Sequence, residues 1–127
     1  MTKLLIIGIG GFIGSISRYL VSGAAQNLSK NLIFPVGTFT VNLLGCLLIG
    51  FLSQLSETRG LLTDSSRAFI IVGVLGGFTT FSAFGNETLN LLRDGETNLA
   101  LINAIGSVII CLIGVWLGRA IAYGIWR

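Results

Sequence analysis

The stretch Gly76-Gly77-Phe78-Thr79-Thr80-Phe81-Ser82-Ala83-Phe84 interrupts a long apolar segment, residues 68–92. Paired glycines and paired threonines are poor helix formers, because glycine is conformationally free and threonine is β-branched. The stretch also carries three hydroxyl groups where a membrane-spanning helix would meet hydrocarbon. Irregular backbone at membrane depth is stable only where protein buries it or where it lines a polar cavity. The stretch therefore predicts a broken helix, and it is the first place to expect a bound ion or a pore.

The composition of the whole chain is that of a membrane protein. The 127 residues are 53% hydrophobic and 10% charged, and the mean hydropathy is +0.89. A soluble domain carries roughly 25% charged residues. Because a spanning helix takes ~20 apolar residues, the sequence predicts four spans, at about residues 4–25, 37–55, 68–92 and 99–125. We expect an all-α integral membrane protein with four transmembrane helices, the third broken near its middle, and a single transmembrane domain over residues 1–127.

Several classes of function lack the residues that they need. The net charge of +3 comes from scattered lysines and arginines, so no basic cluster interleaved with aromatic residues supports nucleic-acid binding. The chain has no histidine, and Cys46 and Cys111 each fall inside an apolar segment. We interpret the two cysteines as small packing residues rather than a disulfide or metal ligands. The apolar segments contain no Cys/His pair and no carboxylate pair, so we predict that the protein is not an enzyme.

Pairs of glycines four residues apart predict close contacts between helices. Gly10 and Gly14 lie in the first span, and Gly114 and Gly118 lie in the fourth. Such pairs let helix backbones approach one another in lipid. The segment around Gly10 also resembles a dinucleotide-binding fingerprint, but Ile13 occupies the third glycine position and the acidic residue expected ~20 residues later is missing. We interpret these glycines as packing positions.

One asparagine lies well inside the second span, and another lies well inside the fourth. Asn42 follows Thr38 by four residues in the second span, and Asn103 precedes Ser107 by four in the fourth. Residues four apart share a helix face, so the two pairs predict two polar stripes. An amide in hydrocarbon needs a partner. Asn42 either bonds to a neighbouring helix or donates its N–H groups to a permeating anion, and the residues alone leave both readings open.

Arg18 and Glu87 each fall within an apolar segment, and each has two readings. Arg18, next to Tyr19, is either an interfacial residue near the end of the first span or a residue that sets the electrostatics of an anion vestibule. Glu87 follows Phe84 by three residues and so can share its face. Glu87 either extends toward the membrane surface or accepts a hydrogen bond that links helices or lies at a pore mouth.

The charges that flank the spans are nearly balanced between the two sides of the membrane. Four spans place five basic residues on one side and three on the other: Lys3, Arg59, Arg67, Arg119 and Arg127 against Arg18, Lys30 and Arg93. This bias is weak, so chains can insert in both orientations and pair as an antiparallel homodimer. The two broken helices then meet near the two-fold axis, where backbone carbonyls suit a hard cation such as sodium. Covering the polar stripes is a second reason to expect a homodimer.

Three segments together resemble the CrcB/Fluc family of small fluoride channels. They are Gly11-x-x-Gly14-x-x-x-Arg18-Tyr19, Gly37-Thr38-x-x-Val41-Asn42-x-x-Gly45, and Gly76-Gly77-Phe78-Thr79-Thr80-Phe81-Ser82-x-Phe84 followed by Glu87. The resemblance covers essentially the whole chain, and the third segment is the most specific. It implies an antiparallel, dual-topology homodimer with two fluoride pores and a structural sodium ion at the dimer centre.

The resemblance also implies roles for individual residues. The backbone carbonyls of Gly76 and Thr79 would hold the sodium ion, Phe81 and Phe84 would be the rings that fluoride passes, and Asn42 would be the pore amide. Ala83 stands where many relatives have threonine. The rest of the expected fluoride path consists of Thr38, Thr80, Ser82, Asn103 and Ser107, with Arg18 in a vestibule and Glu87 at a pore mouth or between helices.

The expected function is therefore a fluoride-selective passive channel in a bacterial plasma (inner) membrane, which exports cytoplasmic fluoride and so reduces its toxicity. Fluoride is small and strongly hydrated, and amide or hydroxyl donors can replace its water without a full positive charge that would trap it. The positive edge of a phenylalanine ring can also face an anion. Two alternatives stay open. One is a small proton-coupled exporter, which needs a carboxylate in the membrane, and the other is a structural helix bundle without transport.

Overall fold

The computed structural model describes residues 1–125, and within that range four helical segments are long and apolar enough to cross a membrane. This confirms the four predicted spans. The first, second and fourth are α1 (Thr2–Ser29), α2 (Val36–Arg59) and α6 (Thr97–Ile125). The third contains α3 (Asp64–Arg67), η1 (Ala68–Leu75), α4 (Gly76–Phe78) and α5 (Phe81–Arg93). All four begin before the predicted positions, because hydropathy marks only the apolar part of a helix.

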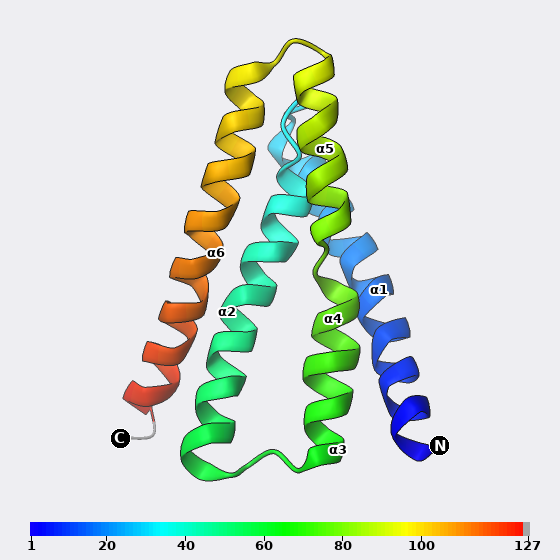
Figure 1. Ribbon diagram of the computed structural model, residues 1–127, viewed down its shortest axis with the longest axis vertical. Coiled ribbons are helices and arrows are strands. Elements are labelled where there is room, and N and C mark those ends of the chain that lie inside the picture. The colour runs from blue at the N-terminus through cyan, green and yellow to red at the C-terminus, as the bar shows by residue number, and fades with distance from the viewer. Residues whose placement is uncertain (126–127) are drawn as a thin grey trace.

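The third span changes its neighbour halfway along its length. Its first half, η1 and α4, packs against α1, whereas its second half, α5, packs against α6. The largest contact joins α2 to α6, and α1 also packs against α2. Figure 1 shows that a short link that is not helical separates α4 from α5. The break in this span is therefore the point at which the bundle passes from one helix pair to the other.

The predicted glycine pairs lie at these helix contacts, which confirms their interpretation as packing positions. A Cβ atom at Gly10 would stand 2.5 Å from the Phe69 carbonyl oxygen, and one at Gly114 would stand 3.1 Å from Leu43 Cδ1. A Cβ at Gly118 would overlap the Leu47 carbonyl oxygen. Glycine at these positions therefore allows α1 to approach η1 and α6 to approach α2.

The break falls at the threonines and not at the glycines. Gly76 has helical dihedral angles, φ −62° and ψ −38°. Thr79 and Thr80 are extended, with φ −88° and ψ 160° at Thr79 and φ −153° and ψ 120° at Thr80. Gly77 serves packing instead, since a Cβ there would lie 2.6 Å from the Gly11 carbonyl oxygen. The interruption predicted within residues 76–80 is therefore present, but only its threonines leave the helix, and the π-helical segment η1 was not predicted.

The two ends of the bundle carry most of the charges that the topology assigned to them, and the exception is Arg18, which lies well inside α1. The N-terminus, the α2–α3 link and the end of α6 lie at one end in Figure 1, and the α1–α2 and α5–α6 links lie at the other. At the first end, Arg119 forms a bidentate ion pair with Glu57, in which both N···O distances are 2.9 Å. Arg127, which the charge count used, lies outside the described residues.

Candidate functional site

Asn42 of α2 joins the broken helix through both ends of its carboxamide. Its Oδ1 accepts the backbone N–H of Thr80 at 2.8 Å, and its Nδ2 donates to the Thr80 carbonyl oxygen at 3.0 Å. In an unbroken helix that N–H would donate to the carbonyl of Gly76, four residues earlier. Of the two readings of Asn42, the structure bears out the bond to a neighbouring helix.

The two ends of the break are stabilised by threonine hydroxyls. Thr79 Oγ1 donates to the carbonyl oxygen of Leu75 at 3.0 Å, at the end of the first half. Thr80 Oγ1 accepts the N–H of Ala83 at 3.2 Å and so caps the N-terminus of α5. Threonine is among the residues preferred at an N-cap. The threonine pair therefore provides the local reason why one helix ends and another starts here.

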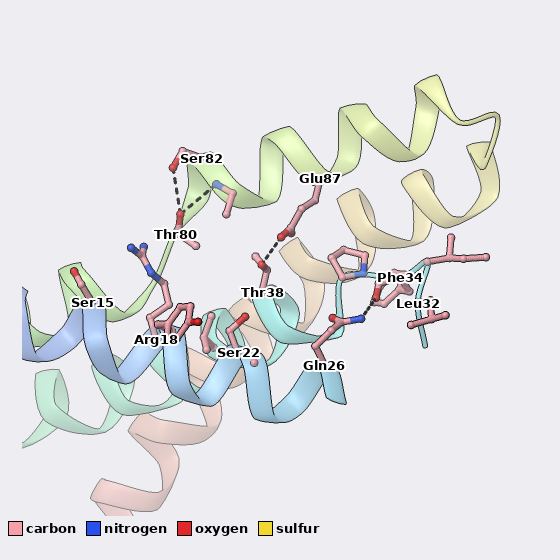
Figure 2. A pocket seen from close by; sticks show the side chains of 16 residues that line it. Ser15, Arg18, Ser22, Gln26, Leu32, Phe34, Thr38, Thr80, Ser82 and Glu87 are labelled. Carbon is pink, nitrogen blue, oxygen red and sulfur yellow. Dashed lines mark hydrogen bonds between the residues drawn. The ribbon is translucent and has the colours of Figure 1, made fainter. Parts of the chain in front are cut away.

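Arg18 lies well inside α1, and its side chain reaches the break. Its Nη1 donates to the Thr79 carbonyl oxygen at 3.4 Å. In Figure 2 the guanidinium extends from α1 toward the extended chain around Thr80. Arg18 also lines a polar cavity, where charged side chains within apolar spans are usually found. This supports the vestibule reading of Arg18, which stays a prediction.

An open polar cavity of about 1120 Å³ lies between α1, α2 and the start of α5. Its walls bring together Arg18, Thr38, Thr80, Ser82 and Glu87, five of the predicted site residues. Figure 2 shows these side chains around one hollow. Sequence reasoning did not single out three other polar members of the wall: Ser15, Ser22 and Gln26.

Gln26 organises the wall of the polar cavity on the side of the α1–α2 link. Its Nε2 donates to the Phe34 carbonyl oxygen at 3.1 Å, and its Oε1 accepts the N–H of Gly37 at 3.0 Å. The Phe34 ring meets the Phe39 ring edge-on, with centroids 5.8 Å apart. The link is thereby held against the end of α1, and Gln26 was detectable in the sequence only as a polar residue near a helix end.

Glu87 lies on α5 and points into the polar cavity. Thr38 Oγ1 donates to its Oε1 at 2.6 Å, which links α2 to α5. The other oxygen, Oε2, is buried and has no hydrogen-bond partner among the described residues. The reading of Glu87 as a helix-linking acceptor is therefore borne out. The spacing of three residues also suggested that Glu87 shares a helix face with Phe84, but the two side chains line different cavities.

The second cavity, of about 460 Å³, is mainly apolar and lies on the other side of the break. It is lined by Asn42, Thr79, Phe81, Phe84 and Ser107, together with aliphatic side chains of the third and fourth spans. The rings of Phe81 and Phe84 are 5.3 Å apart and tilted by 40°. Phe81 is 82% exposed, so no described residue of its own chain covers most of that ring. Thr80 lines both cavities and separates them.

The polar stripe of the fourth span is buried against α5. Asn103 is 2% exposed, and its Nδ2 donates to Thr88 Oγ1 at 2.9 Å. Ser107 Oγ donates to Asn103 Oδ1 at 3.4 Å, and Thr88 Oγ1 donates to the Phe84 carbonyl oxygen at 2.7 Å. The stripe thus runs from Ser107, in the apolar cavity, to Thr88, which sequence reasoning missed. Thr88 lies one turn after Phe84 on the same helix, and that spacing was the only available signal.

The comparisons with known proteins agree over nearly the whole chain. Residues 5–119 match the family described as "CrcB-like protein, Camphor Resistance (CrcB)". The chain is 46% identical to "Fluoride-specific ion channel FluC" of Opitutus terrae, with 98% of this chain and 96% of that protein covered. It is 42% identical to "Fluoride-specific ion channel FluC 3" of Methanosarcina barkeri, with 98% and 93% covered. It is also 42% identical to "Fluoride-specific ion channel FluC" of Geobacter sulfurreducens, with 93% and 94% covered.

Proposed function

The chain belongs to the CrcB-like protein family, and on that premise we propose that it forms a fluoride-specific ion channel, a multi-pass membrane protein with no enzymatic activity. The observation that carries the proposal is the near-full-length similarity to proteins that bear this name. The site supports it, because two cavities meet at a helix break inside the apolar spans. A structural helix bundle without transport would leave these cavities unexplained.

We propose that the polar cavity is the vestibule in which the anion exchanges water for protein donors. Arg18 attracts the anion. The hydroxyl groups of Thr80 and Ser82, whose oxygens are 3.2 Å apart, line the same cavity as Arg18. The anion then passes the break at Thr80 and enters the apolar cavity beside Asn42, Phe81 and Phe84. Amide N–H groups and the positive edges of aromatic rings stabilise an anion without trapping it. A narrow path of this kind favours fluoride over the larger chloride.

The rest of the proposed path follows the polar stripe of the fourth span and the link between α2 and α5. Ser107 and Asn103 offer a hydroxyl and an amide in sequence along α6, and Thr88 continues that line on α5. Thr38 and Glu87 form the outer part of the vestibule, where the bond between them joins two helices. In this proposal Glu87 organises the vestibule and relays no proton.

We further propose an antiparallel homodimer with a structural sodium ion at its centre. The protomer leaves Gly76 and most of the Phe81 ring exposed, which is the surface that a second copy would cover. The donor chemistry fits the ion, because backbone carbonyl oxygens are ligands for hard cations. The carbonyl oxygens of Gly76 and Thr79 would hold the ion. A carbonyl oxygen has two lone pairs, so Thr79 can bind a cation and still accept from Arg18. When bound, the ion joins the two breaks and so stabilises the dimer.

Ion efflux from liposomes that contain only this protein tests the proposal. We expect rapid fluoride release and no chloride release, without a proton gradient. Liposomes that retain both ions would contradict the channel, and fluoride release that requires a proton gradient would favour a coupled exporter. The dimer is tested separately by the mass of the protein in detergent, which we expect to be that of two chains and to fall toward one when sodium is replaced by a large organic cation.

A further inference from the structure

We propose that Asn42 is the positioning residue of the broken helix, in addition to any contact that it makes with the anion. Its carboxamide replaces the helical hydrogen bond that the backbone N–H of Thr80 loses at the break. It therefore determines the direction of the chain between Thr79 and Phe81. This inference rests on the proposed function only for its effect on ion flux, since the bond itself is a property of the fold.

The first argument is the match between the two hydrogen-bonding groups. A carboxamide carries one acceptor oxygen and N–H donors, as a peptide group does. Asn42 meets the backbone of Thr80 in both directions, at 2.8 Å and 3.0 Å. Only one orientation of the amide satisfies both partners, because the N–H of Thr80 needs an oxygen and its carbonyl needs a donor. A backbone N–H left without a partner in an apolar bundle costs substantial free energy.

The second argument is the shape of α2 around Asn42. Gly45, one turn later, has no side chain, and a Cβ there would overlap Thr79 Cγ2. The methyl group of Thr79 therefore packs where another residue would place its own side chain. The amide of Asn42 and the gap at Gly45 together form a seat on α2 for the extended residues Thr79 and Thr80. Arg18 adds only one longer contact, at 3.4 Å, from the opposite side.

The third argument concerns the part of the amide that the break does not use. The Nδ2 group has two N–H donors, and the bond to Thr80 occupies one of them. Asn42 also lines the apolar cavity with Phe81 and Phe84. The bonds that hold the break thus also fix the plane of the amide, and so the direction of its second N–H. One side chain therefore couples the backbone of the break to the anion path.

The test compares amide hydrogen exchange at Thr80 with fluoride efflux in the full-length protein. Asn42→Leu keeps the size of the side chain and removes its acceptor, so we expect exchange at Thr80 to become about tenfold faster or more. Asn42→Asp keeps an oxygen for the N–H of Thr80 but replaces the donor to the Thr80 carbonyl by a second acceptor, so exchange should rise less than in Asn42→Leu. Both variants should lose fluoride efflux, Asn42→Asp because it brings a negative charge into the path.

The matched control is Asn86→Leu, which makes the same change at an exposed amide of α5. We expect it to leave both exchange at Thr80 and efflux unchanged. If Asn42 serves only as an anion donor, Asn42→Leu will lose efflux while exchange at Thr80 stays at the wild-type rate, and that result would overturn the inference. The inference would also be overturned if the amide of Thr80 exchanged as fast in Asn42→Asp as in Asn42→Leu.

A second variant keeps the inference testable if Asn42→Leu fails to fold. Gly45→Ala leaves Asn42 in place but adds a methyl group where Thr79 Cγ2 lies. It should push the break away from α2 and raise exchange at Thr80, and an unchanged rate would contradict the proposed seat. A wild-type protein that conducts no fluoride would count against the proposed function alone, since the exchange rates report on the fold.

Discussion

The contact between α1 and the first half of the third span allows a test in which the same substitution has opposite effects at two positions of one helix. A Cβ atom at Gly14 would overlap the Val74 carbonyl oxygen and lie 3.0 Å from the Phe78 nitrogen. At Gly8, six residues earlier, no described atom lies within 4 Å of the corresponding position. We therefore expect Gly14→Ala to destabilise the protein and Gly8→Ala to stabilise it.

The magnitude follows from two opposing effects. Replacing glycine by alanine inside a helix favours the folded state by about 1 kcal/mol. Inserting a methyl group into a filled contact costs about 1–3 kcal/mol. At Gly14 the cost is at the upper end, because Val74 and Phe78 present backbone atoms that cannot rotate away. The net expectation is a loss of about 1–2 kcal/mol for Gly14→Ala and a gain of up to about 1 kcal/mol for Gly8→Ala.

The assay is reversible unfolding in mixed micelles with increasing dodecyl sulfate, followed by circular dichroism. The free energy of unfolding of each variant is compared with that of the wild type under one set of conditions. Shifts of equal sign and size in Gly14→Ala and Gly8→Ala would refute the reasoning. That outcome would mean that α1 does not approach η1 and α4 as closely as the structure shows.

Three further predictions concern the site. Phe81→Ile and Phe84→Ile should each slow fluoride efflux several-fold, because an aliphatic group has no positive ring edge for the anion. Unchanged efflux in both variants would mean that the two rings serve only helix packing. Glu87→Gln should keep much of the efflux, since a channel needs no proton relay, whereas complete loss would favour a proton-coupled exporter. Thr38→Val should lower the free energy of unfolding by about 1–3 kcal/mol, because it removes the donor to a partly buried carboxyl group. The same change at Thr58, whose hydroxyl is exposed, should have little effect in the same unfolding assay.

The break shows how far local patterns predict a membrane fold. The glycines and threonines of residues 76–80 predicted an interruption of the third span, and the span is interrupted there. The pattern did not say which residues leave the helix, because glycine in lipid serves close packing as readily as it serves flexibility. Gly77 packs against Gly11, so the extended residues are Thr79 and Thr80. That choice depends on a neighbouring helix and is absent from the local sequence.

For the polar residues, too, the local sequence predicted some contacts and helix packing decided others. Four-residue spacing correctly grouped Asn103 with Ser107, which are hydrogen-bonded within α6. The spacing did not reveal Thr88 as the partner on α5, because a contact between two helices depends on how they are rotated against each other. In the same way, three-residue spacing placed Glu87 beside Phe84, but packing directs them into different cavities.

The sequence by itself determined the number of spans, the presence of a break in the third, the glycine contacts and the family, because each depends on composition or on residues close together in the chain. The tertiary structure alone decided what the polar groups at the break do. Asn42 bonds to Thr80 and Arg18 reaches Thr79, over separations of 38 and 61 residues. In an apolar bundle a polar group bonds to whatever partner packing brings within reach, so the roles of these two side chains follow from which helices meet at the break.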